Sequence, residues 1–155
     1  TTSLMMEVMQ KEEKFIRDHK VLDMGCGTGI LAILAAKMKS ATPVHAIDID
    51  PTAVLSVREN AWKNRVHEKI DSRCGDASLI QAGKYDIILA NINRNILLQD
   101  MATYTRGLLP GGVLVISGFY TQDLQMLTEE GSRCGLEYEY HLEKENWVAA
   151  KFTKK

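Results

Sequence analysis

The feature that most constrains the fold is a glycine-rich turn between a short apolar segment and a helix-forming segment. Residues Lys20–Met24 are typical of a short apolar strand, Gly25–Gly29 form the turn, and Ile30–Lys39 are rich in Ala and Leu. A strand, a tight turn and a helix in this order open a doubly wound α/β sheet, which binds ligands at the carboxyl ends of its strands. Glycines let the backbone approach a ligand closely, and the free amides of a helix terminus favour an anion.

Alternating strand and helix patterns continue along the chain. Further strands are expected at residues 43–49, 70–74, 85–90, 113–117, 136–142 and 147–152, and helices at 51–63, 95–106 and 122–130. The last two strands are joined by too short a connection for a helical crossover, so they must pair antiparallel. We therefore predict an α/β fold with a doubly wound, mostly parallel seven-stranded sheet and an antiparallel C-terminal hairpin strand.

Length and charge indicate a single domain over residues 1–155, with a leading amphipathic helix over residues 1–18. Lys plus Arg number 19 and Asp plus Glu number 20, so no direct nucleic-acid binding is expected. No apolar run approaches the roughly 20 residues that span a bilayer, so no membrane partner is expected. Three cysteines, Cys26, Cys74 and Cys134, form no disulfide framework, which favours the cytoplasm. Because the chain starts at Thr1 without Met, we expect it to be a piece of a longer protein.

The turn differs from the usual dinucleotide-binding fingerprint. Counted from Gly25, the sixth residue is Ile30, and the third glycine comes one position early, at Gly29. Asp23, at the end of the preceding strand, is expected to point into the pocket. Its carboxylate would repel a pyrophosphate, but it suits a cationic ligand such as the α-ammonium group of S-adenosylmethionine. This contrast favours a methyltransferase over a dehydrogenase.

Polar residues also follow the next three predicted strands. Asp48 can accept both hydroxyls of a ribose, whereas Asp50 is interpreted as a helix cap. Asp76 is placed to accept from an adenine amino group, with a turn aspartate as the alternative. The amide oxygen of Asn91 can accept from an amine substrate and aim its lone pair at a methyl group, with a strand-end or cap role as the alternative.

Other reactive residue types receive structural interpretations. Cys26, inside the glycine turn, is expected to line the cofactor pocket as a small residue rather than act as a nucleophile. The histidines lack ligand spacing, so no metal site is expected; they are His19, His45, His67 and His141.

Two segments carry a family resemblance. Residues 21–29 resemble the first motif of class I S-adenosylmethionine-dependent methyltransferases, and residues 46–51 resemble their second. Within that class the chain resembles the bacterial ribosomal protein L-eleven methyltransferase family from end to end. The segments that carry this closer resemblance are Thr1-Thr2-Ser3-Leu4, Asn60-Ala61 with Asn64, Ala90-Asn91-Ile92, Ile116-Ser117-Gly118 and Trp147-Val148-Ala149.

The resemblance implies a Rossmann-like domain that methylates lysine side chains and the terminal amine of a large-subunit ribosomal protein. It implies S-adenosyl-L-methionine as the cofactor, Asn91 as the catalytic residue, and a separate amino-terminal domain that recognises the substrate. The expected cofactor contacts are Thr2, Asp23, Gly25, Cys26, Gly27, Gly29, Asp48, Ile49, Asp76 and Asn91.

Three alternatives stay open at this point. The chain is a methyltransferase for another protein or a small molecule, an NAD-dependent oxidoreductase, or a binding domain that holds cofactor without transferring methyl. The acceptor, the number of methyl groups transferred and the oligomeric state are not determined by these patterns.

Overall fold

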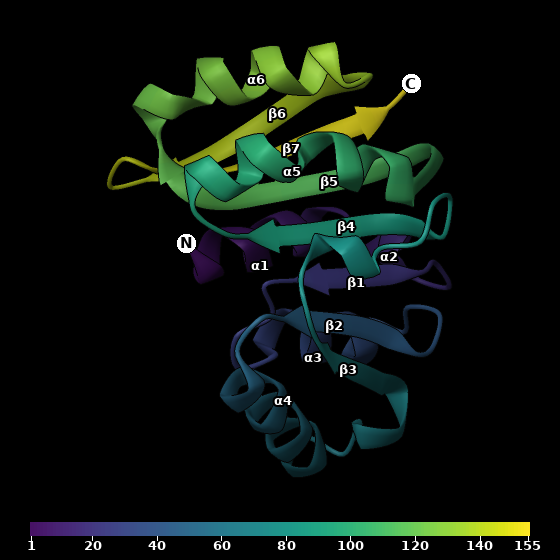
Figure 1. The fold of residues 1–155 in the computed structure, drawn as a ribbon. Helices are drawn as coiled ribbons and strands as arrows, with labels where there is room; N and C mark the ends of the chain where they lie inside the picture. Colours follow the sequence, from purple (N-terminus) through teal and green to yellow (C-terminus); the bar gives the residue numbers. More distant parts are fainter.

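A computed structural model describes all 155 residues, 1–155. Its seven strands form one sheet with the order β3-β2-β1-β4-β5-β7-β6 (Figure 1). Strands β1 to β5 pair parallel with one another, whereas β7 is antiparallel to both β5 and β6. The predicted fold class is therefore confirmed. The strands are β1 (Val21–Met24), β2 (Val44–Asp48), β3 (Ile70–Cys74), β4 (Tyr85–Asn91), β5 (Leu108–Tyr120), β6 (Leu136–Lys144) and β7 (Trp147–Lys154).

Helices cover both faces of the sheet. Helices α1, α3 and α4 share one hydrophobic cluster with the sheet, and α5 and α6 share the other (Figure 1). Strand β4 shows the alternation, because Ile87 and Leu89 belong to the first cluster and Ile88 and Ala90 to the second. Burial on both faces explains the continuous apolar run of this strand. The α-helices are α1 (Thr2–Lys11), α2 (Glu13–Ile16), α3 (Ile30–Lys37), α4 (Pro51–Lys63), α5 (Arg94–Gly107) and α6 (Leu124–Arg133).

The leading segment differs from the single helix expected over residues 1–18. The helix is interrupted at Glu12, and α2 ends at Ile16. Glu12 makes an ion pair with Lys151 of β7 at 2.8 Å and accepts a hydrogen bond from the Tyr140 hydroxyl at 3.0 Å. These tertiary contacts fix the break, which the amphipathic pattern of the segment does not reveal.

Strand β5 begins earlier than the predicted 113–117 segment. The expected Pro-Gly-Gly turn lies inside the strand as a bulge, because Tyr85 and Ile87 of β4 pair with Leu108 and Val113 of β5. Gly111 supplies a positive φ of 81° at this bulge. The turn residues thus bend the strand outward without ending it.

The C-terminal hairpin is confirmed. Strands β6 and β7 pair antiparallel around Glu145 and Asn146, whose φ values of 51° and 74° are both positive. This backbone conformation is the one required by a two-residue hairpin turn that matches strand twist.

Strands β1, β2, β4 and β5 all end at one edge of the sheet, and the amino terminus lies beside the end of β4 (Figure 1). Between β3 and β4 the chain makes only a short 3-10 helix, Ala77–Leu79, instead of a full crossover helix. None of the helices is long and apolar enough to cross a membrane.

Candidate active site at the carboxyl ends of the strands

The glycine turn follows β1 and starts α3. Gly25, Gly27 and Gly29 have φ values of 72°, 55° and 85°, which side chains rarely adopt. A Cβ atom on Gly25 would lie 2.8 Å from the Ile92 side chain, and one on Gly29 would lie 3.0 Å from Val57. A Cβ on Gly27 would meet nothing within 4 Å, so Gly27 is the glycine whose backbone faces open space.

Asp48 connects the end of β2 to this turn. Its Oδ2 accepts a hydrogen bond from the Gly27 amide at 2.9 Å, and its Oδ1 accepts from the Asp50 amide at 2.9 Å. Each carboxylate oxygen has a second lone pair, so the group can still accept from two ligand hydroxyls. Asp50 caps α4 by accepting from the Thr52 amide, as its cap interpretation predicts.

Asp23 lies beneath the turn, and the expectation that it points into the open pocket is wrong. The residue is 1 % exposed, and its Oδ2 accepts a hydrogen bond from the Ala32 amide of α3 at 3.1 Å. Its Oδ1 is buried without a hydrogen-bond partner. Burial raises the pKa of this carboxyl to about 7, because desolvation penalises the charged form. The strand-end position gave no signal that the helix packs over this side chain.

Asn91 is held by both threonines at the start of the chain. The Thr1 hydroxyl donates to Asn91 Oδ1 at 2.9 Å, and Asn91 Nδ2 donates to the Thr2 hydroxyl at 3.3 Å. The predicted site residue Thr2 is thus brought next to Asn91. Thr1 was not among the predicted site residues, although it stands in the same paired-threonine motif.

Asp76 has the turn role that was its alternative interpretation. Its Oδ1 accepts hydrogen bonds from the Ser78 amide at 2.9 Å and from the Ser78 hydroxyl. Both bonds lower the pKa of Asp76, and the bond from the Ser78 hydroxyl contributes most. The carboxyl group therefore stays ionised and accepts hydrogen bonds. The side chain is exposed and still lines the pocket, so capping and ligand contact are compatible.

Cys26 is buried at 7 % exposure. Burial and the nearby Asp23 raise the pKa of its thiol to about 12, so it is not a nucleophile at neutral pH.

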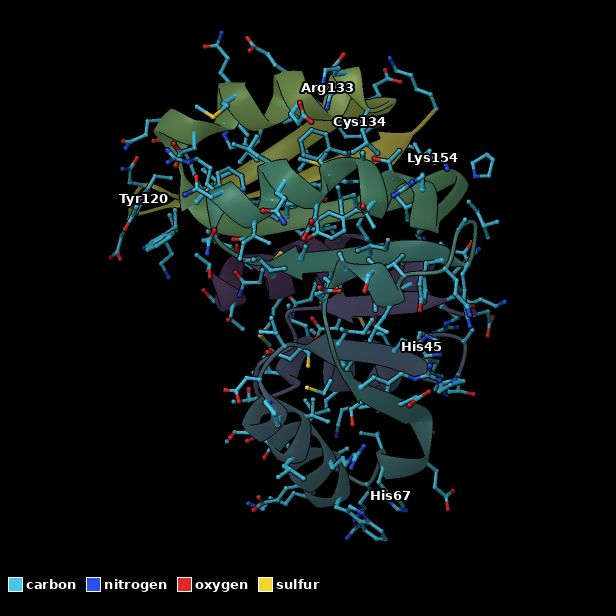
Figure 2. The ribbon with its side chains drawn as sticks, in the orientation of Figure 1. His45, His67, Tyr120, Arg133, Cys134 and Lys154 are labelled. Carbon is cyan, nitrogen blue, oxygen red and sulfur yellow. The ribbon has the colours of Figure 1, made fainter.

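Two of the histidines, His45 and His67, lie away from this edge (Figure 2). His45 bonds the Tyr85 hydroxyl and His67 stacks on Trp62, in keeping with the structural roles expected of them.

A cavity of about 240 Å³ joins these elements. Of the predicted site residues, five line the cavity: Gly25, Asp48, Ile49, Asp76 and Asn91. The other five do not line it: Thr2, Asp23, Cys26, Gly27 and Gly29. The lining residues that sequence reasoning missed are Met24, Gly75, Ile92, Ile96, Asp100 and Tyr104. Helical periodicity on α5 places the last three on one face, which was the available signal.

The family comparison agrees with this geometry. The family model described as "Ribosomal protein L11 methyltransferase (PrmA)" matches residues 1–155. The chain belongs to this family. The family resemblance predicted from the motifs is therefore confirmed over the whole chain.

Curated members of the family are similar over the full chain. Ribosomal protein L11 methyltransferase of Porphyromonas gingivalis is 49 % identical over 154 residues, which are 99 % of this chain and 52 % of that protein. The Phocaeicola vulgatus protein of the same name is 44 % identical over 156 residues, covering 100 % and 54 %. The chain thus spans about half the length of the curated relatives it matches.

Solved structures show the same fold. The ribosomal protein L11 methylase of Lactobacillus delbrueckii subsp. bulgaricus superposes with a TM-score of 0.91 at 26 % identity, over 100 % of this chain and 79 % of that one. A methyltransferase from Listeria monocytogenes, described as putative and S-adenosylmethionine dependent, has a TM-score of 0.81 at 13 % identity over the full length of both chains, which shows the fold alone.

Proposed function

We propose that this chain binds S-adenosyl-L-methionine in the cavity and transfers its methyl group to amines of a ribosomal protein, at lysine side chains and the terminal amine. The observation that carries the proposal is that Gly25 of the glycine turn, Asp48 and Asn91 line one cavity. Membership of the ribosomal protein L11 methyltransferase family supports the choice of reaction and acceptor. Because its acceptor is ribosomal, we place the protein in the cytoplasm.

The residues present fit this cofactor. Asp48 offers free lone pairs to the ribose hydroxyls, and Asp76 offers an acceptor to the adenine amino group. The amides that follow Gly27 at the start of α3 suit the cofactor carboxylate. The Asp23 carboxyl is buried beneath the turn and lies outside the cavity, so we assign it no direct contact with the cofactor.

The cofactor supplies an electrophilic methyl group on a sulfonium. When bound, it would give this methyl group to a neutral amine: a C–N bond would replace the C–S bond, with S-adenosylhomocysteine as the leaving group and a protonated methylamine as the product. Asn91 Oδ1 has two lone pairs, of which the Thr1 hydroxyl uses one, so the other can accept from the incoming amine. The chain thereby orients the acceptor, and orientation alone can remove a large part of the barrier.

The amine must be neutral to react. A lysine amine has a pKa near 10.4 and a terminal amine one of about 7.7 to 8.0, so proton loss precedes transfer. The titratable groups at the turn are unsuited to this step, because Asp23 is buried and Cys26 keeps its proton. We therefore assign positioning and exclusion of water to the chain and proton removal to solvent.

Cofactor titration separates this function from a nicotinamide-dependent oxidoreductase. Calorimetry should show binding of S-adenosylhomocysteine and no binding of NAD. Transfer of a labelled methyl group to the ribosomal protein, but not to a version with its amines acetylated, would support the acceptor class. Binding of NAD alone would refute the proposal.

A further inference from the structure

The cavity is lined by a residue whose buried hydroxyl the proposed mechanism does not use. Tyr104 of α5 is 0 % exposed, it lines the cavity, and its hydroxyl has no hydrogen-bond partner in the protein. A buried polar group without a partner is costly, so such groups are uncommon unless a ligand satisfies them. Desolvation by burial raises the pKa of this phenol, so at neutral pH the group is a hydrogen-bond donor.

Two carboxyl groups line the same cavity as this donor. Asp100 lies one helical turn before Tyr104 on α5, and its charge acts on the Tyr104 hydroxyl. Asp76, from the segment after β3, lines the same cavity and acts in turn on Asp100. The lining of the cavity therefore includes one phenolic donor and two carboxyl acceptors.

The position of these three groups relative to the other contacts identifies the part of the ligand they meet. Asp48 is assigned to the ribose and Asn91 to the methyl group of the cofactor. The rest of the cavity lining, with Tyr104 and the two carboxyl groups, is left for the adenine base. That lining also carries the apolar side chains of Ile49 and Ile96, which suit the faces of a flat ring.

We propose that Tyr104 and Asp100, with Asp76, read the edge of the base and select a 6-aminopurine. This inference rests on the proposed function and adds two base-reading residues to it. The edge of adenine offers an amino donor beside a ring-nitrogen acceptor. Carboxyl oxygens accept from the amino group, and the Tyr104 hydroxyl donates to the ring nitrogen. Hypoxanthine presents an oxygen and a ring N–H instead, so it would place acceptor against acceptor and donor against donor.

Calorimetry with S-adenosylhomocysteine and its hypoxanthine analogue tests the assignment. The unsubstituted protein should bind the adenine compound at least about tenfold more tightly. Tyr104→Phe should weaken binding of the adenine compound about three- to tenfold, the range for one hydrogen bond. Binding of the hypoxanthine compound should stay unchanged or become tighter, because the substitution removes the donor that opposes its ring N–H, so the ratio of the two affinities falls. Asp100→Asn should lower the ratio of the two affinities further, because the amide of Asn can donate to the hypoxanthine oxygen.

A stability measurement separates base reading from a structural role. Without ligand, Tyr104→Phe should leave the denaturation midpoint unchanged or raise it, because the substitution removes an unpaired buried hydroxyl. Tyr85→Phe is the matched control, since the Tyr85 hydroxyl is bonded to His45 at 2.5 Å and does not line this cavity. Tyr85→Phe should lower the midpoint and leave the affinity for S-adenosylhomocysteine unchanged.

Each outcome is decisive. Unchanged affinity for S-adenosylhomocysteine in both Tyr104→Phe and Asp100→Asn overturns the inference and leaves the proposed function intact. An equal loss for both compounds, accompanied by a lower midpoint, shows a packing role and also overturns it. Absence of S-adenosylhomocysteine binding by the unsubstituted protein would refute the proposed function itself, and this inference with it.

Discussion

The Thr1 hydroxyl and the Asn91 amide oxygen, 90 positions apart in the chain, are joined by a hydrogen bond of 2.9 Å. With the bond from Asn91 Nδ2 to Thr2, it fixes the amide of Asn91 from both ends. The start of α1 thereby sets the orientation of the residue proposed to receive the acceptor amine.

Asn91→Ala should lower turnover more than it weakens cofactor binding, because its proposed contact is to the acceptor. Methyl-transfer rates and calorimetric affinity for S-adenosylhomocysteine measure the two effects. Asn93→Ala is a matched control, because Asn93 caps α5 by accepting from the Ile96 amide. It should cost about 1 kcal/mol of stability with little effect on turnover. Loss of cofactor affinity alone in Asn91→Ala would contradict the acceptor role.

Asp23 should make the unligated protein less stable as pH rises from about 4 to about 7. The folded-state pKa is about 7 against 3.8 for the unperturbed group, with burial as the main cause. Between these values the unfolded chain has lost the proton and the folded chain still holds it, so the free energy of unfolding falls with pH. The change is at most roughly 4 kcal/mol, from about 1.36 kcal/mol for each pKa unit.

Denaturant unfolding at pH 4 to 8 checks this, with Asp23→Asn as the comparison. The variant keeps a side-chain oxygen for the Ala32 amide and cannot ionise. The difference in stability between the two proteins should grow in favour of the variant as pH rises to about 7. Parallel pH curves would show that Asp23 does not titrate in this window.

Two glycines of the turn should respond differently to alanine. Gly29→Ala should lower stability by at least about 1–2 kcal/mol, because its left-handed backbone penalises a Cβ that would also press on Val57. Gly27→Ala has the same backbone penalty, but its Cβ would point into open space. Gly27→Ala should therefore lose less stability than Gly29→Ala and more affinity for the cofactor. Thermal unfolding and calorimetry on both variants make the comparison, and identical profiles would contradict the assignment of Gly27 to the ligand side.

We propose that the part of the relatives outside the match captures the acceptor. The chain carries 19 basic and 20 acidic residues, so its net charge does not favour the capture of a charged ribosomal protein. We expect this 155-residue chain to methylate the ribosomal acceptor more slowly than the full-length Porphyromonas gingivalis relative, with similar S-adenosylhomocysteine affinity. Equal turnover on the same acceptor would show that residues 1–155 suffice for recognition.

Patterns of local sequence predict much of this fold. The apolar runs and the helix cap at Asp50 place the strands and α4 closely, because burial on two faces and capping are local signals. The break at Glu12 and the bulge in β5 were not predicted, since tertiary contacts to Lys151 and the pairing with β4 determine them.

The site was predicted less completely than the fold. Strand ends locate Asp48 and Asn91, because parallel strands bring such residues to one edge. The burial of Asp23 under α3 depends on how the helix packs, and a single strand-end position does not contain that information. Asp100 and Tyr104 were not predicted either. Their helix, α5, packs against the core, and its sequence pattern does not show that some of its residues also line the cavity.

The most direct test is calorimetric titration of S-adenosylhomocysteine and NAD into the unsubstituted chain and Asp48→Ala. Asp50→Ala serves as control, because Asp50 caps α4 and does not line the cavity. We predict that S-adenosylhomocysteine binds and NAD does not, and that Asp48→Ala weakens binding by about 1–3 kcal/mol through the loss of buried hydrogen bonds. Asp50→Ala should leave affinity unchanged. Heat with NAD alone, or the same S-adenosylhomocysteine affinity in Asp48→Ala, would contradict the proposed cofactor site.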